Sequence, residues 1–137
     1  MQHHWLETQV ERLHRLAERQ QRAPHSDGKQ ARRDFREAVG EVTAEVARRE
    51  GVTACFVCHD GLLVETAGRA PDFDALSAMA QQWMVAGKEA ALTLSLGKVR
   101  QMVIVGEEHK LALFVIGQVA VGILSPSSVS LGRALAN

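Results

Sequence analysis

Two cysteines, a histidine and an aspartate fall within six residues of this chain, as Cys55, Cys58, His59 and Asp60. The Cys-x-x-Cys spacing is used by thiol redox enzymes and metal sites, to which His59 would add a ligand. A redox motif of this kind works at a helix start, where the helix dipole lowers a thiol pKa. Here the cysteines lie in a β-rich run, where residues three apart point to opposite faces. We therefore expect two packed, reduced thiols and keep a thiol or metal enzyme as an alternative.

Other catalytic patterns give no stronger candidate. The serines at 125, 127, 128 and 130 have no histidine near them in the sequence, and they are typical of caps and loops. His59 and His109 fall at predicted turns, where solvated side chains are expected. The sequence contains no Gly-x-x-x-x-Gly-Lys-Ser/Thr loop to hold a nucleotide phosphate. We expect no catalytic residue, metal or cofactor.

Composition narrows the classes of partner. The chain has 137 residues, with 16 basic and 16 acidic side chains, so its formal net charge is zero. Such a balance gives no net field that would draw it to nucleic acid or to an anionic membrane. There is no tyrosine, which leaves little aromatic surface for stacking bases. No apolar run is long enough to span a bilayer and no export signal is visible, so we expect a soluble cytoplasmic protein.

The cysteine run belongs to a predicted hairpin. Residues 54–58 and 62–64 are β-rich and flank Asp60-Gly61, a strong signal for a two-residue turn. A long helix is predicted from Asp72 to Leu96. Three more strands are predicted between Val99 and Leu124, with breaks at 106–110 and 117–118. This order predicts an α+β fold with a five-stranded antiparallel sheet.

Two helices are predicted before the sheet. Residues 3–22 carry a narrow apolar stripe that requires a partner helix, and residues 23–28 read as a linker or sharp reversal. Residues 29–49 form a second helix that should cover the sheet and end at Gly51. We therefore predict an N-terminal helix and linker at 1–28 and a domain at 29–137. The charge runs around Arg32-Arg33 and Arg48-Arg49 are expected to be solvated.

The helix from Asp72 has more apolar surface than the sheet needs. A helical wheel at about 100° per residue gathers nine residues on a sheet-facing arc, and Val85 and Leu92 fall on the opposite side with Ser77. We predict an exposed, partner-binding ridge on that side, formed by Gln81, Val85, Lys88 and Leu92. The sheet-facing arc comprises Met79, Ala90, Trp83, Leu76, Leu94, Gly87, Ala80, Ala91 and Met84.

An open sheet edge would favour pairing with a second copy. The strand predicted from Val99 to Val105 has no proline and few charges to discourage such pairing. Continuing the sheet through it would bring the long helices of two copies together in one self-complementary interface. The interface is predicted to contain Val99, Gln101, Val103, Val105, Met84 and Ala91.

The order of elements resembles the Roadblock family, which is named after dynein light chains. The resemblance covers roughly residues 31–135 and is carried by residues 57–68, by 94–106 with Leu96-Gly97, and by 111–117. It implies a longin- or profilin-like α-β-β-α-β-β-β-α fold with helices on both faces of the sheet, here with an extra N-terminal helix. The last helix is expected to be short, with a cap and start at Ser125-Pro126-Ser127-Ser128.

The resemblance implies a homodimer with a ten-stranded sheet and two long helices side by side. Family members use those helices to bind Ras-like small GTPases, and some activate the GTPase without supplying a catalytic arginine. We expect a non-catalytic regulator of this type. A constitutive scaffold in a signalling or motility complex, indifferent to GTP, is the alternative.

Overall fold

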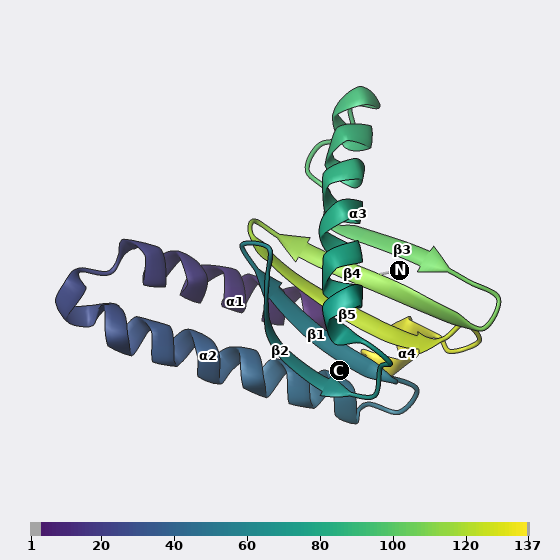
Figure 1. Ribbon diagram of the computed structural model, residues 1–137, viewed down its shortest axis with the longest axis horizontal. Helices are drawn as coiled ribbons and strands as arrows, with labels where there is room; N and C mark the ends of the chain where they lie inside the picture. Colours follow the sequence, from purple (N-terminus) through teal and green to yellow (C-terminus); the bar gives the residue numbers. More distant parts are fainter. Residues whose placement is uncertain (1–3, 137) are drawn as a thin grey trace.

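The computed structural model describes residues 4–136, except for the side chains of His4, His25 and Ser26. The chain forms four helices and five strands within this range (Figure 1). They are α1 (His4–Arg22), α2 (His25–Arg48), β1 (Ala54–His59), β2 (Leu62–Gly68), α3 (Phe73–Thr93), β3 (Gln101–Val105), β4 (His109–Ile116), β5 (Val119–Pro126) and α4 (Leu131–Ala134).

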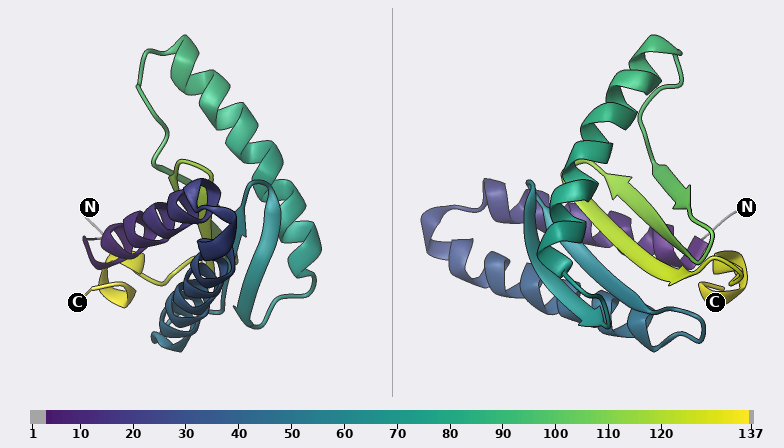
Figure 2. Two further views of the ribbon diagram at one scale, coloured as in Figure 1. Left: turned by 90° about the vertical axis from the view of Figure 1, so that its left-hand side faces the viewer. Right: turned by 45° about the vertical axis from the view of Figure 1, so that its right-hand side comes forward.

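The strands form one antiparallel sheet in the order β2-β1-β5-β4-β3, so β2 and β3 are both edges. Helices α1 and α2 cover one face and α3 crosses the other (Figure 2). The predicted five-stranded sheet with helices on both faces is confirmed. The described helices include none long and apolar enough to cross a membrane.

The predicted β1–β2 hairpin is present with its turn at Asp60-Gly61. Asp60 has φ 52° and Gly61 has φ 79°, so both turn residues are left-handed. Two left-handed central residues define the turn type whose twist matches paired strands, and glycine adopts that conformation without steric cost. The hairpin was therefore predictable from two adjacent residues.

Strand β1 divides its side chains between two cores. Cys55 and Val57 face the core under α1 and α2, whereas Phe56 and Cys58 face the core under α3. On the α3 side Phe56 lies over Gly122 of β5, where an added Cβ would come 2.3 Å from the ring. The two cysteines thus point to opposite faces of the sheet, as the strand geometry predicted.

The α1 stripe finds its partner helix within the chain. Leu6, Val10, Leu13 and Ala17 are buried in the same core as α2 and the sheet. The connection is shorter than predicted, because α2 already begins at His25 after a reversal at Ala23-Pro24.

Two other predictions about helix ends need correction. Arg49 is half-buried over the Trp5 ring and is not a solvated side chain. Ser125 and Pro126 lie in β5, and it is Ser130 that caps α4 by accepting a hydrogen bond from the Arg133 amide. In sequence, a strand that ends in Ser-Pro resembles a helix start. The sequence also does not show that Trp5 lies beside Arg49.

Candidate interaction surface

Helix α3 lies on the sheet only along its first half. Its start is fixed by Asp72, whose side chain accepts a hydrogen bond from the Ala75 amide at 3.0 Å. Its second half leaves the sheet and projects beyond it (Figures 1 and 2). Val85 is 60% exposed and Leu92 is 82% exposed. The projecting half therefore presents apolar surface that the rest of the described chain does not cover.

The orientation of α3 differs from the predicted wheel. Its buried residues are Ser77, Ala80, Met84 and Ala91. Met79, predicted to face the sheet, is 46% exposed. On a helical wheel the observed buried face is rotated by roughly 60° from the predicted one.

A hydrogen bond between α3 and β1 accompanies this rotation. Ser77 was predicted to face solvent, but it is only 7% exposed, and its Oγ lies 3.3 Å from Cys58 Sγ. A buried hydroxyl needs such a partner, and β1 supplies one. Leu94, predicted to face the sheet, is left 65% exposed.

The predicted ridge is largely at the surface. Val85, Lys88 and Leu92 are exposed, and we call these three residues the outer crest. Gln81 instead is half-buried beside the β1–β2 turn, with its Oε1 3.5 Å from the position of an added Cβ on Gly61. Gln81 thus lies on the flank of the crest, next to the hairpin.

A second apolar line on α3 was not recognised in the sequence. Met79, Trp83, Ala86 and Ala90, which we call the inner flank, are spaced by four, three and four residues, and all but the half-buried Trp83 are exposed. This spacing places them along one side of the helix, and the small alanines permit close approach of another helix. The three-four spacing was visible, but the wheel placed Met79, Trp83 and Ala90 in the sheet-facing arc and left Ala86 unassigned.

Strand β3 is an edge with apolar residues open on both faces. Val103 and Val105 are exposed on one face and Ile104 on the other. Met102 packs against Gly87 of α3, which ties this edge to the helix. The strand begins at Gln101, so Val99 precedes it in the connecting loop.

Two residues predicted for the dimer interface are buried within a single protomer. Met84 is buried in the core under α3, and Ala91 is also buried within the same protomer. They have almost no free surface for a second copy. The open apolar surface of α3 is therefore the inner flank and the outer crest.

Comparison with known protein families identifies a domain in this chain. The Roadblock/LC7 domain family matches residues 38–124. The chain belongs to this family. The match starts within α2, so α1 and the first part of α2 lie outside it.

Solved structures share the Roadblock fold. The chain is similar to a Roadblock/LC7 domain from Streptomyces avermitilis, with 23% identity, a TM-score of 0.59, and coverage of 67% of this chain and 80% of that one. It is similar to the gliding protein MglB from Thermus thermophilus, with 20% identity, a TM-score of 0.63, and coverage of 72% and 78%. It is also similar to MglB from Myxococcus xanthus, with 16% identity, a TM-score of 0.62, and coverage of 71% of this chain and 77% of that one. No curated protein matches the chain in sequence.

The projecting end of α3 forms one side of an open groove in this Roadblock domain. The groove has a volume of about 730 Å³ and lies between α3, the loop before β3 and the β4–β5 turn. Leu92, Val99 and Val115 contribute its apolar lining, and Lys88 and Lys98 its positive charge. The groove is open and would leave much of a small molecule exposed, whereas small-molecule sites bury most of their ligand, so it suits a segment of another chain better.

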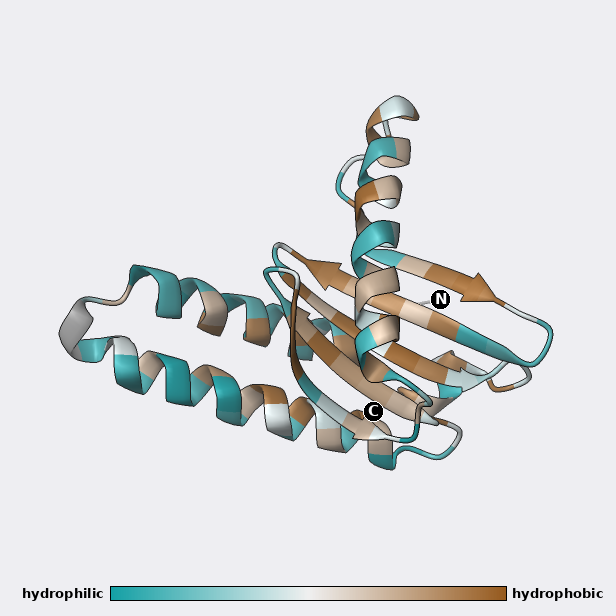
Figure 3. Ribbon diagram, viewed as in Figure 1, coloured by the Kyte–Doolittle hydropathy of each residue, from teal (hydrophilic) through white to brown (hydrophobic). Residues whose placement is uncertain are grey.

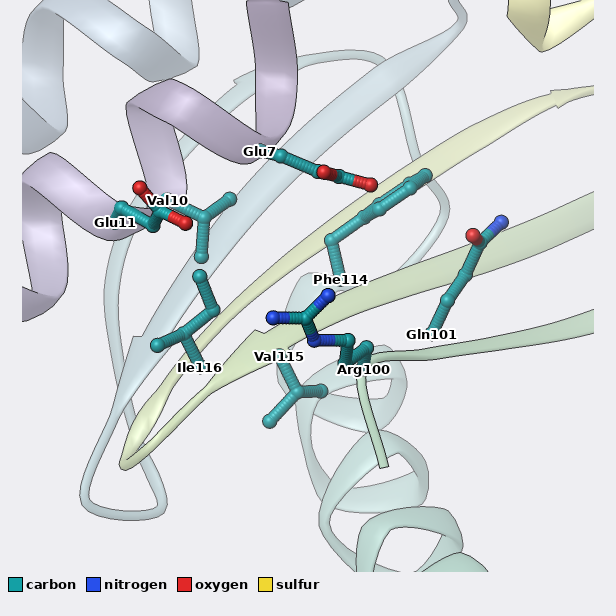
Figure 4. A pocket seen from close by; sticks show the side chains of 8 residues that line it. All are labelled: Glu7, Val10, Glu11, Arg100, Gln101, Phe114, Val115 and Ile116. Atoms are coloured by element: carbon teal, nitrogen blue, oxygen red, sulfur yellow. The ribbon is translucent and has the colours of Figure 1, made fainter. Parts of the chain in front are cut away.

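A much smaller cavity lies where α1 meets β3 and β4. Figure 4 shows Arg100 beside Phe114, with the carboxylates of Glu7 and Glu11 on the α1 side. The cavity measures about 40 Å³, which is room for a water molecule or two but not for an organic cofactor. It identifies α1 as a neighbour of the β3 edge.

The cysteine cluster does not have the environment of a reactive site. Burial raises the pKa of the Cys55 thiol to about 12, and burial also raises the pKa of Cys58. Reactive cysteines need the opposite shift. His59 packs its ring on Phe35, with centroids 5.1 Å apart, so it is not the solvated turn residue that was predicted. Within residues 4–136 no three potential ligands gather as a metal site.

Proposed function

We propose that this Roadblock domain is a non-catalytic homodimeric platform that binds a Ras-like small GTPase. The observation that carries the proposal is the surface of α3, whose projecting half keeps an apolar crest and an apolar flank uncovered beside an open sheet edge. Membership of the Roadblock family supports it, because family members serve as such platforms. The domain would act by binding one nucleotide state of its partner more tightly than the other.

The proposed dimer forms through β3 and the inner flank of α3. Two β3 strands paired edge to edge would cover the exposed Val103, Ile104 and Val105 and remove the unpaired backbone groups of that edge. The two α3 helices would then approach each other, with Ala86 and Ala90 at the contact because their side chains leave room for a close crossing. A two-fold axis makes the same residues meet in both copies.

The outer crest is the proposed GTPase contact. Val85, Lys88 and Leu92 project away from the sheet and from the inner flank, so dimerisation through that flank would leave them accessible. In the dimer each crest would lie on the outer side of its helix, where Val85 and Leu92 give an apolar centre and Lys88 a basic rim, the usual composition of a protein-binding site. Gln81 lies at the border of this surface.

The test is an affinity capture from native cell extract, performed in parallel with GDP and with a non-hydrolysable GTP analogue. We expect a small GTPase to be retained in one nucleotide state only. Val85→Arg and Lys88→Glu should each reduce its retention without loss of fold. Arg48→Glu, an exposed change at the far end of α2, is the matched control and should retain it normally.

A constitutive scaffold is the second candidate. Helix α1 lies outside the residues matched by the family, yet it is packed into the core, so this chain adds helical surface to the domain. A scaffold would retain the same partners with either nucleotide and no GTPase among them. That outcome would refute regulation of a GTPase.

A further inference from the structure

The helical hairpin formed by α1 and α2 extends well past the sheet. His14 packs against Gly117 in the β4–β5 turn and Phe35 against His59 at the end of β1, and both helices continue beyond these contacts (Figure 1). The projecting part is largely hydrophilic (Figure 3). Between positions 15 and 36 there are seven basic and three acidic residues, in a chain of zero net charge. The hairpin tip is therefore locally positive.

The charges that alternate along the α2 sequence separate in space. Lys29, Arg32, Arg33 and Arg36 follow the spacing i, i+3, i+4 and i+7, which places them within an arc of roughly 100°. We call this set the basic flank. Asp34, Glu37 and Glu41 fall on the other side of the buried face.

The acidic side of α2 is already partnered by α1. Arg19 lies 2.7 Å from Asp34 and Arg12 lies 3.0 Å from Glu41. Arg19 and Gln30 donate hydrogen bonds to Asp34, and they hold its pKa below the ordinary value. These pairs orient the hairpin so that its acidic residues point between the helices.

The basic flank itself is exposed and has no such partner. All four of its residues are at the surface, and none makes an ion pair with another residue of the described chain. The flank stops at Gly40, where Glu65 of β2 approaches to 4.0 Å from the position of an added Cβ. The positive charge of the flank is thus confined to two turns of α2, about 10 Å long.

We propose that the basic flank is a docking site for an acidic helical segment of a partner protein. A partner helix with carboxylates at i, i+3, i+4 and i+7 repeats the spacing and the length of the flank. A duplex nucleic acid or a bilayer would be broader than the flank and would meet Glu37 and Glu65 beside it, where its own negative charge is repelled. This site lies at the β2 side of the sheet, away from the β3 edge and independent of the GTPase platform.

The test measures binding of a fluorescent acidic peptide to the full chain by anisotropy. The peptide carries glutamate at the stated spacing on an alanine helix, and a second peptide has glutamine in place of each glutamate. We expect saturable binding of the glutamate peptide only, weakened about tenfold or more by Arg32→Glu with Arg33→Glu and by raising salt from about 0.05 M to about 0.5 M. Arg15→Glu with Arg22→Glu, equally exposed on α1, should leave the affinity within about twofold.

Three results would overturn the proposal. The first is no saturable binding of the glutamate peptide up to about 1 mM chain. The second is equal weakening by the α1 and α2 double variants, which would indicate attraction to general positive charge. The third is tighter binding of a DNA duplex or of phosphatidylserine vesicles than of the peptide. Circular dichroism of each variant ensures that a loss of binding is not a loss of fold.

Discussion

The guanidinium carbon of Arg49 lies 3.9 Å from the centroid of the Trp5 ring. The same arginine donates hydrogen bonds to the carbonyls of Ala134 and Ala136 and lies 3.6 Å from Glu45 Oε1. One side chain therefore joins the start of α1, the end of α2 and the segment after β5. Helix α1 is held at this end by a polar contact as well as by its apolar stripe.

Arg49→Ala is expected to lower the free energy of unfolding by about 1–3 kcal/mol, because it removes a half-buried cation–π contact and leaves two carbonyls without this donor. Arg48→Ala, whose only described ion pair is with Glu45 on the exposed side of α2, should cost less than about 0.5 kcal/mol. Urea unfolding followed by circular dichroism gives both values. Equal losses would show that Arg49 does not join these segments.

Gly122→Ala is expected to destabilise the sheet by about 1–3 kcal/mol, because the new methyl group would occupy the space of the Phe56 ring. The loss should be partly recovered when Phe56→Leu is added, since the smaller side chain makes room. Gly40→Ala is the control: its Cβ meets only Glu65 at 4.0 Å, and alanine in a helix should stabilise by up to about 1 kcal/mol. Additive losses in the double variant would contradict this account.

Stability should fall on the alkaline side because of Cys55. The pKa of its thiol is about 12 in the folded chain against an ordinary 9.0. Below pH 9 both states keep the proton. Between these values only the unfolded state releases it, so the free energy of unfolding falls as pH rises, by at most about 1.4 kcal/mol per pH unit. Tyrosine does not contribute, as the chain has none.

The measurement is urea unfolding from pH 8 to pH 11, with Cys55→Ala as the comparison. The variant should be less stable at neutral pH, because it leaves a small cavity, but its stability should fall less steeply above pH 9. Parallel curves for the two chains would refute a role for the thiol.

Ala90→Arg should disrupt the proposed dimer. The change places a long cation in the inner flank, where two helices are expected to approach closely, and it leaves the core untouched because Ala90 is exposed. Glu89→Arg, one residue away on the outward side, serves as the matched control. Light scattering after gel filtration should give a dimer for the native chain and the control, and a monomer for Ala90→Arg. A native monomer would refute the dimer.

The sequence predicted the fold well where the signals were local. Asp60-Gly61 marked the hairpin, and the breaks near Gly106 and Gly117 separated the last three strands as observed. The apolar stripe of α1 predicted a partner helix, and that helix is α2.

Long-range contacts account for the errors. Ser77 is buried beside Cys58, which lies on a separate strand and offers it a hydrogen-bond partner, so a polar residue belongs to the side of α3 that meets the sheet. A wheel that counts apolar residues cannot contain that information. Likewise, Arg32 and Asp34 both belong to a run of alternating charges, which predicts solvated side chains for both. Only the placement of α1 shows that Asp34 is paired with Arg19, whereas Arg32 lies on the other side of α2.

The strand order also determines how the chain can reach its native state. The β1–β2 hairpin joins the β3–β4–β5 meander only through the pairing of β1 with β5, in which Ala54 lies opposite Leu124, about 70 residues further along the chain. Each half is a local structure that can form early, but neither has a complete core alone. Such distant pairing slows folding, since a long loop must close before its contacts contribute. Joining the two halves is therefore expected to be the rate-limiting step, and substitutions at the β1–β5 seam should slow folding more than substitutions at the outer strands.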